Sequence, residues 1–385
     1  MSKKLRLLFA VFLLFSSISV FVSCITNQNI ARNLYFISSP YAGVDWETFG
    51  QFKAALHVHT SNSDGRDSLY SVLEDHYLKG FDIVAITDHN FLTMDWVSAR
   101  NGLTQERFDE IAAGVGRNGR GMLMIPATNE QSRHEHINTL FVNHNNRILD
   151  SIETSLMATA AQNGIAFINH PGRYTGGRRS NVLGRWASNN RTTIKRYVDL
   201  FIRFPSCVGM EIINRLDGDS FHDRILWDNI LKETVPQGRF VWGFSNDDTH
   251  QNDNTGFSFN IMLMPENTLA AFRYSMKAGS FLAVARVARL ELGGNFKGTG
   301  PVPAVTSIEV DNDALTITIS SNNTTTINWI YGSEVIATGN TMHVNNYFNK
   351  IGSYVRANII GPGGIVFTQP FGLNAKNTLP AWCHS

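Results

Sequence analysis

Residues 54–90 constrain the chain most, because they place metal-type side chains at the ends of two apolar runs. The stretch reads AALHVHTSNSDGRDSLYSVLEDHYLKGFDIVAITDHN. The first run ends in His57 and His59, and the second ends in Asp88 and His89, with a helix-length segment between them. This order predicts two neighbouring strands of a parallel α/β sheet or barrel, in which sites form where the strands end.

The spacing within this stretch indicates a cation site. Residues two apart on a strand point to the same face, so His57 and His59 can reach one cation together. Asp64 lies in the polar turn between the strands and offers a carboxylate. Imidazole and carboxylate ligands without thiolate suit Zn, Mn or Fe. A single His-x-His pair is an ordinary strand end, whereas this pair followed by Asp64 and a second strand ending in Asp-His favours a metal site.

Further apolar runs later in the chain carry the same residue types at their ends. Glu130 follows the run at 122–125, and His136 opens the run INTLFV. His170 follows the run at 165–168, and the last run, RFVWGFSNDDTH, closes with Asp248-Thr249-His250. Because the ends of parallel strands meet at one edge, these side chains are expected to converge.

Four sequence segments resemble motifs of the PHP (polymerase and histidinol phosphatase) superfamily of metal-dependent phosphoesterases. They are LHVHTSNSDG, IVAITDHN, HPGRY and the closing Asp-x-His, and the resemblance covers about residues 54–290. It implies an α/β fold, a distorted (β/α)7-type barrel, with two or three divalent metal ions (Zn, Mn or Fe) at the strand ends. The family pattern favours His136 over the nearby His134 and His144, and Asp248 over Asp247.

The resemblance also implies a division of nine ligands. The first ion would take His57, His59, Glu130 and Asp248; the second would share Glu130 and add His136 and His170; the third would take Asp64, His89 and His250. Arg173, in the HPGR loop, would hold the phosphate of a small phosphorylated substrate, because guanidinium groups bind phosphate bidentately. Arg178 and Arg179 are weaker candidates for this role.

The expected reaction is hydrolysis of a phosphoester, either a monoester or a diester. Adjacent cations lower the pKa of a bridging water toward about 7 and supply hydroxide at neutral pH. The residues expected to carry the reaction are His57, His59, Glu130, Asp248 and Arg173. Two alternatives stay open: a carboxyl-ester or carbamate hydrolase on the same metal site, and a non-catalytic surface lipoprotein. Glu211, inside a strand, is expected to be structural or to lie behind the ligands, and His222 to lie on a helix surface.

Residues 1–24 have the pattern of a signal peptide. Lys3, Lys4 and Arg6 precede the apolar residues 7–22, and Ser23-Cys24 follows. The end resembles a bacterial lipoprotein box, although Phe21 stands where Leu is commoner. We expect lipidation at Cys24, export to the cell envelope and a lipid anchor in the membrane. A plain secreted protein or an uncleaved anchor is the alternative.

Length and composition fit a globular chain with two domains. The 385 residues are 43% hydrophobic and 17% charged. Loss of the three basic residues of the signal segment would turn the net charge from +1 to −2, which leaves no basic field to suggest nucleic-acid binding. Whether Cys207 and Cys383 pair stays open.

Three further segments are expected after the signal segment. Residues 25–53 are expected to be a linker and lead-in, and 54–296 the metallohydrolase domain. In 297–385, short alternating runs separated by Asn, Gly and Asp turns predict a small antiparallel β-sandwich-like domain, whose partner is unknown.

Overall fold

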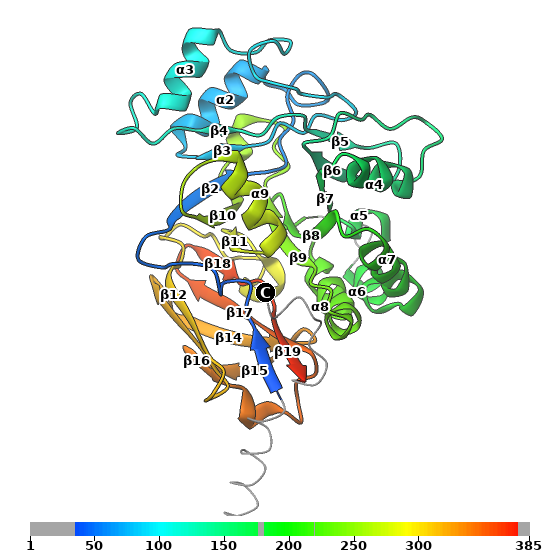
Figure 1. The fold of residues 1–385 in the computed structure, drawn as a ribbon, viewed down its shortest axis with the longest axis vertical. Coiled ribbons are helices and arrows are strands. Elements are labelled where there is room, and N and C mark those ends of the chain that lie inside the picture. The colour runs from blue at the N-terminus through cyan, green and yellow to red at the C-terminus, as the bar shows by residue number, and fades with distance from the viewer. Residues whose placement is uncertain (1–34, 176–180, 219, 376–385) are drawn as a thin grey trace, which may run out of the picture.

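The computed structural model describes residues 35–175, 181–218 and 220–375. It shows a mixed α/β protein with several sheets, in which helices and strands alternate up to α10 (Arg289–Leu292) and strands dominate afterwards (Figure 1). The predicted signal segment with Cys24, the arginines Arg178 and Arg179, and Cys383 lie outside the described residues. Within the described ranges, no helix is long and apolar enough to cross a bilayer.

One sheet has five strands in the order β5–β6–β7–β8–β9. Their bounds are Asn129–Gln131, Ile137–Leu140, Ile165–Ile168, Cys207–Asn214 and Trp242–Asn246. The pairs β5–β6 and β6–β7 are antiparallel, whereas β7–β8 and β8–β9 are parallel. Every residue of the five strands is buried, which explains why β7 and most of β8 read as continuous apolar runs rather than alternating ones.

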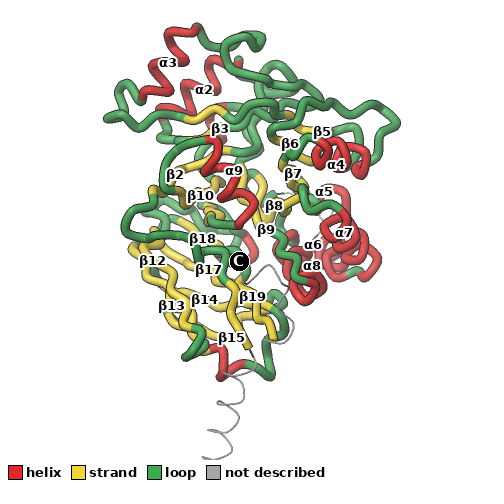
Figure 2. Tube along the Cα trace, in the orientation of Figure 1, coloured by secondary structure: helices red, strands yellow, loops and turns green. Residues whose placement is uncertain are grey.

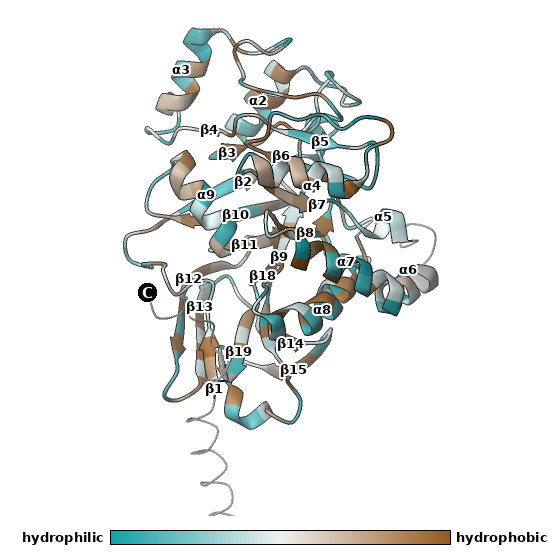
Figure 3. Cartoon of the chain, turned by 45° about the vertical axis from the view of Figure 1, so that its right-hand side comes forward, coloured by the Kyte–Doolittle hydropathy of each residue, from teal (hydrophilic) through white to brown (hydrophobic). Residues whose placement is uncertain are grey.

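Five helices lie beside this sheet, on the right of Figure 1. They are α4 (Ile152–Ala161), α5 (Gly172–Thr175), α6 (Asn181–Asn189), α7 (Arg191–Arg203) and α8 (Asp223–Thr234). Hydrophilic and hydrophobic residues share the surface of α7 (Figure 3). Its buried residues include Tyr197, Val198 and Phe201, so the helix turns one apolar side to the core.

The first motif belongs to a larger, eleven-stranded sheet. β2 (Gly50–Ala55), β3 (Ile83–Val84) and β4 (Leu123–Met124) are parallel to one another, and β10 (Ser258–Met264) and β11 (Phe281–Ala285) continue from β2 in antiparallel pairs. Helices α2 (Leu69–Leu78), α3 (Gln105–Ala113) and α9 (Leu269–Ala278) accompany these strands. β3 is shorter than the apolar run that predicted it, and the connection from β3 to α3 is loop (Figure 2).

Two isolated bridges join the sheets at the end where the motifs lie. Val58, after β2, pairs with Thr249, after β9, and His89, after β3, pairs with Glu130 of β5. The seven-stranded barrel is not confirmed, because the described strands are assigned to separate sheets rather than to one closed ladder. The bridges nevertheless bring the carboxyl ends of β2, β3 and β9 together.

The C-terminal strands pair across the predicted domain boundary. They are β12 (Ala304–Asp311), β13 (Thr316–Asn322), β14 (Thr326–Tyr331), β15 (Glu334–Thr338), β16 (Thr341–His343), β17 (Tyr354–Gly361), β18 (Gly364–Phe367) and β19 (Phe371–Ala375). β12, β13 and β16 form a separate three-stranded sheet, whereas β18 pairs with β11. β1 (Tyr35–Ser38), from the segment expected to be a linker, pairs with β19. The β region is therefore hydrogen-bonded to both ends of the α/β part.

Local signals account for the helix bounds. Ser68, Thr104, Ser151 and Thr268 each precede a helix and accept a backbone N–H of its first turn through their side-chain oxygen. Gly279 ends α9 in the left-handed conformation, with a φ of 76°, as a glycine C-cap requires.

The prediction of a surface position for His222 is wrong. His222 is 5% exposed at the start of α8, and Asp223, Trp227 and Asp228 on that helix are completely buried. The reason is that α8 is covered on two sides: it contacts β8 and the neighbouring helices, and Asp228 binds Arg356 of β17. An amphipathic pattern predicts one exposed face, which a second covering layer removes.

Candidate metal centre

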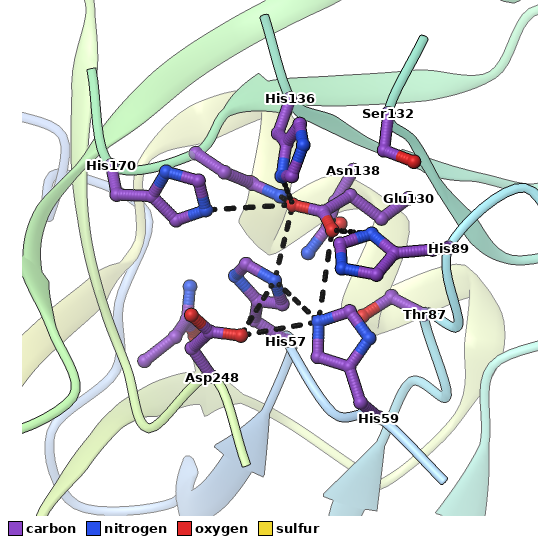
Figure 4. Close-up of polar contacts among 12 residues, drawn as sticks. His57, His59, Thr87, His89, Glu130, Ser132, His136, Asn138, His170 and Asp248 are labelled. Atoms are coloured by element: carbon purple, nitrogen blue, oxygen red, sulfur yellow. Dashed lines mark hydrogen bonds and ion pairs between the residues drawn. The ribbon is translucent and has the colours of Figure 1, made fainter. Parts of the chain in front are cut away.

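The nine residues predicted as ligands converge at one end of the sheets. They group into four overlapping sets whose ligand atoms lie within 4.8 Å of one another: His59, Asp64, His89 and His250; His57, His170 and Asp248; His57, His59 and Glu130; His89, Glu130 and His136. His57 and His59 follow β2, His89 follows β3, His170 follows β7, and Asp248 and His250 follow β9. Figure 4 shows the imidazoles arranged around Glu130, with Asp248 beside His57 and His59.

Glu130 lies at the centre of the cluster and uses both carboxylate oxygens. Oε1 is 3.0 Å from His136 Nδ1, 3.3 Å from His57 Nε2 and 3.6 Å from His170 Nε2. Oε2 is 2.5 Å from His89 Nδ1 and 3.7 Å from His59 Nε2. Glu130 lies on the short strand β5 rather than in a turn after β4, which holds its backbone in a ladder with β6. One carboxylate thus faces the ligand sets on both sides of it.

Asp248 faces the same two histidines as Glu130 from another direction. Its Oδ1 is 3.1 Å from His59 Nε2 and 3.3 Å from His57 Nε2. The backbone of Asp248 is left-handed, with a φ of 48°, immediately before the Val58–Thr249 bridge. This turn aims the carboxylate inward at the point where the chain leaves β9.

A third group lies toward the solvent. Asp64 Oδ2 is 3.2 Å from His250 Nε2 and 3.5 Å from His89 Nε2, and Asp64 Oδ1 is 3.7 Å from His59 Nδ1. The Asp64 side chain is 55% exposed, whereas those of His57 and Glu130 are fully buried. The centre therefore runs from a closed inner part to an open outer part.

The buried atoms of the centre fit divalent cations. His89 Nδ1, His136 Nδ1 and Glu130 Oε2 are buried and make no hydrogen bond among the described residues. His89 Nδ1 and His136 Nδ1 nevertheless lie 2.5 and 3.0 Å from the oxygens of Glu130. Buried polar atoms without hydrogen bonds are costly in free energy. A cation coordinated by both the imidazole and the carboxylate would remove this cost. The donor set, nitrogen and oxygen without sulfur, is that of Zn, Mn or Fe.

Comparisons with known proteins give a local sequence match and structural matches with TM-scores below 0.5. No protein-family model matches the chain. The DNA polymerase/3'-5' exonuclease PolX of Bacillus subtilis is 40% identical over 66 residues, which are 17% of this chain and 11% of that protein. The match thus spans about a tenth of that relative's length. The nine residues predicted as ligands converge on one centre.

Among solved structures, a two-domain protein of Bacteroides vulgatus containing a predicted PHP-like metal-dependent phosphoesterase aligns with a TM-score of 0.43 and 15% identity, over 86% of this chain and 88% of that one. The lesion-specific endonuclease PfuEndoQ of Pyrococcus furiosus aligns with a TM-score of 0.37 and 16% identity, over 59% and 56%. An amidohydrolase of Chromobacterium violaceum, with bound sulfate and no metal, aligns with a TM-score of 0.33 and 16% identity, over 51% and 87%.

Two of the side chains that competed for ligand roles in the sequence, those of His134 and Asp247, are engaged elsewhere. His134 Nε2 shares a hydrogen bond of 2.9 Å with Ser155 Oγ on α4. Asp247 accepts backbone N–H groups of Gly256, Phe257 and Ser258. Burial raises the pKa of Asp247 to about 7 despite these bonds. The structure therefore brings His136 and Asp248 to the centre, and not these neighbours.

Charges within the centre shift the pKa values of its members in opposite directions. Burial opposes ionisation of Glu130, but the imidazoles of His57, His136 and His170 outweigh it and hold the pKa of Glu130 well below its usual value. Burial likewise opposes protonation of His89, but Asp64 and Glu130 raise the pKa of His89 to about 9. Without cations, His89 therefore holds a proton where a metal ion would otherwise supply positive charge.

Asp88 supports the centre without joining it. Its Oδ1 accepts the Thr60 N–H at 2.7 Å and the Ser63 hydroxyl at 2.6 Å, and its Oδ2 accepts the Thr60 hydroxyl at 2.7 Å. These bonds hold the turn that carries Asp64 against the end of β3. The two residues after β3 thus have different roles: the carboxylate of Asp88 fixes the backbone, and the imidazole of His89 faces Glu130.

Two arginines that the sequence analysis did not single out lie at the open side. A cavity of about 550 Å³ is lined by Asp64, Asp248 and His250 together with Arg66 and Arg215. Arg215 follows β8 directly, and its side chain is 42% exposed. Its position after a strand was the available signal, because His57, His59, His89, His170, Asp248 and His250 also follow strands. Arg173 lies on α5, after the His170-Pro171 turn, and is half-buried.

Proposed function

We propose that the chain is a metal-dependent phosphoesterase that hydrolyses a small phosphorylated substrate, a monoester or a diester. The observation that carries the proposal is the convergence of nine nitrogen and oxygen donors on one centre. This centre opens into a cavity of about 550 Å³ that also contains arginines. A cavity of this volume is in the range of small-molecule sites.

The ligand sets support two or three cations. We propose that His57, His59, Glu130 and Asp248 hold the first, that Glu130, His136 and His170 hold the second, and that Asp64, His89 and His250 hold the third. Divalent cations bound there would lower the pKa of coordinated water toward about 7 and stabilise charge on phosphoryl oxygens. Zn, Mn and Fe all suit these ligands.

The remaining residues would bind and orient the substrate. Arg215 faces the cavity with part of its guanidinium group engaged by Asp248, and Arg66 lines the same cavity. Together with Arg173 they provide the planar, permanently charged donors that recognise phosphate. The two isolated bridges between the sheets support the further proposal that β2, β3 and β5–β9 form a distorted seven-stranded barrel around the site.

The test is hydrolysis by the purified mature protein of a p-nitrophenyl phosphate monoester, the matching diester and a p-nitrophenyl carboxylic ester. Each substrate is assayed with added Mn or Zn, with chelator, and beside a His59→Ala variant. Metal-dependent release from a phosphate substrate that the variant lacks is the expected result. It would also decide between monoester and diester.

Other outcomes distinguish the alternatives. Release from the carboxylic ester alone would replace the proposal with a carboxyl-ester hydrolase. Bound metal without turnover of any of the three substrates would favour a structural metal site. We further propose that Cys24 is lipidated and anchors the mature chain to a membrane of the cell envelope. Incorporation of labelled palmitate that Cys24→Ser abolishes would support the anchor, and equal incorporation in both proteins would overturn it.

A further inference from the structure

Glu211 is a completely buried carboxylate that lies behind the metal centre. Oε1 accepts hydrogen bonds from His57 Nδ1 and Asn246 Nδ2, each at 2.8 Å. Oε2 accepts the backbone N–H of His170 at 2.8 Å and Asn214 Nδ2 at 3.0 Å. One side chain on β8 is thus bonded to groups at the ends of β2, β7, β8 and β9.

The bond to His57 determines which ring nitrogen can bind a cation. Glu211 accepts at Nδ1, so the proton lies on Nδ1 and the lone pair lies on Nε2. Nε2 is the atom that faces Glu130 Oε1 and Asp248 Oδ1, at 3.3 Å in each case. A carboxylate behind an imidazole ligand fixes the ring and increases its basicity.

The bonds of the second oxygen hold the backbone at another ligand. His170 has a left-handed φ of 26°, which is strained for a residue with a side chain. The hydrogen bond from its N–H to Glu211 compensates that strain, because the acceptor is a carboxylate buried in a low-dielectric interior. The same carboxylate therefore positions one ligand of the first proposed ion and one of the second.

We propose that Glu211 is the positioning residue of the metal centre, which orients His57 through its ring and His170 through its backbone. It acts through these two ligands and does not itself contact the metal or the substrate. This inference rests on the metal site of the proposed function. It adds a residue whose removal should weaken metal binding although all nine ligands are intact.

The Glu211→Gln variant tests the negative charge and the second acceptor oxygen of Glu211 while it keeps the size of the side chain. Glutamine has nearly the same shape, but one of its terminal groups is an NH2 donor. If the amide oxygen faces His57, the NH2 group faces the backbone N–H of His170, so that two hydrogen-bond donors oppose each other. A backbone N–H cannot become an acceptor. If the oxygen faces His170, the NH2 group meets His57 and requires the tautomer whose Nε2 is protonated. Each orientation therefore disturbs one metal ligand.

The first measurement is metal affinity, obtained by zinc competition with a chromophoric chelator. We expect Glu211→Gln to weaken zinc binding on the order of 10- to 100-fold. Asp228→Asn is the matched control, because Asp228 is also a completely buried carboxylate with several donors but bonds to Arg356, Tyr354 and Ser333. This control should lower thermal stability and leave zinc affinity of the folded protein unchanged.

A second measurement needs no variant. Nitrogen NMR of ¹⁵N-histidine-labelled, zinc-loaded wild-type protein should show His57 protonated at Nδ1 and bound at Nε2. Protonation at Nε2, or equal zinc affinities in the wild type and Glu211→Gln, would overturn the inference. Neither measurement uses a substrate. The protein could bind zinc in a way that depends on Glu211 and yet hydrolyse no phosphoester. That result would overturn the proposed function and support this inference.

Discussion

Arg215 Nε donates a hydrogen bond of 2.9 Å to Asp248 Oδ2, while Asp248 Oδ1 faces His57 and His59. The two oxygens of Asp248 are thus divided between the inner centre and the cavity. The guanidinium group adds positive charge beside this carboxylate, and together with His57 and His59 it holds the pKa of Asp248 well below its usual value, although burial opposes this. Arg215 also keeps part of its fork exposed to the cavity.

The first prediction concerns how Arg215 and Arg173 discriminate between substrates. Arg215→Ala should lower kcat/KM for phosphate esters about 10- to 100-fold, since hydrogen bonds to charged groups contribute about 1.5–3 kcal/mol. Arg173→Ala should act in the same direction. Arg215→Lys keeps the charge but not the planar fork, and is expected to recover activity only in part. Steady-state kinetics on the phosphate and carboxylic esters measures this. Equal losses on both ester types would mean that Arg215 serves only to hold Asp248.

The second prediction concerns Glu130, whose two oxygens face both inner ligand sets. Glu130→Ala should reduce the metal content of the protein and bring turnover to the level of chelator-treated wild type. The fold should be retained, because the strand pairing of β5 uses backbone atoms. Elemental analysis and circular dichroism check the two parts separately. Full metal content and full activity in the variant would contradict a shared ligand.

The third prediction follows from the raised pKa of His89. The folded pKa is about 9, above the ordinary value of 6.5, so protonated His89 stabilises the metal-free protein. This contribution is fully present below pH 6.5 and is lost as the pH rises through 9. The melting temperature of chelator-treated protein should therefore fall over this window, and His89→Gln should flatten the curve.

Metal binding should show the opposite dependence on pH. A cation must displace the proton from the imidazole, so the rise in melting temperature on adding zinc should grow between pH 6.5 and 9. Thermal melts with and without zinc at three pH values test both curves. A zinc effect that is constant over the window would argue against His89 as a ligand that loses its proton.

The convergence of the candidate ligands could be predicted from the sequence because its signal is mostly local. His57 and His59 lie two apart, and the other ligands except Asp64, which lies in a polar turn, lie near apolar runs that became buried strands or their extensions. Strand ends converge by the geometry of a parallel sheet, so nearness in space followed from position along each strand.

The partners of Glu211 and the exposure of His222 were not accessible in the same way. Glu211 was expected to lie behind the ligands, but its bonds to His57 and His170 join residues 154 and 41 positions away. His222 is buried at the start of α8, a helix that contacts the neighbouring helices α6 and α7, and whose Asp228 binds Arg356 of β17 near the end of the chain. Local periodicity describes one element at a time and contains no information about a second layer from a distant segment.

The last prediction concerns the C-terminal strands, which we expect to be inseparable from the α/β part. Arg356 on β17 donates two hydrogen bonds of 2.8 Å to the carboxylate of Asp228 on α8, and both side chains are buried. Breaking such a pair leaves an uncompensated buried charge and costs about 3–5 kcal/mol. Arg356→Ala should therefore lower the free energy of unfolding by this amount, measured by urea denaturation. Lys350→Ala, an exposed change in the same region, is the control and should have little effect.

Removal of residues 297–385 should be more severe than any single substitution there. β18 covers the edge of β11, and Ile365 and Phe367 pack in the same core cluster as Ala283 and Trp227. Truncation would expose this cluster and an unpaired strand edge, which promotes aggregation. We expect a chain ending at residue 296 to be insoluble or to lack a cooperative melting transition, whereas the full mature chain should unfold in one transition. A soluble truncated protein with full zinc affinity would show instead that the β region is an independent domain.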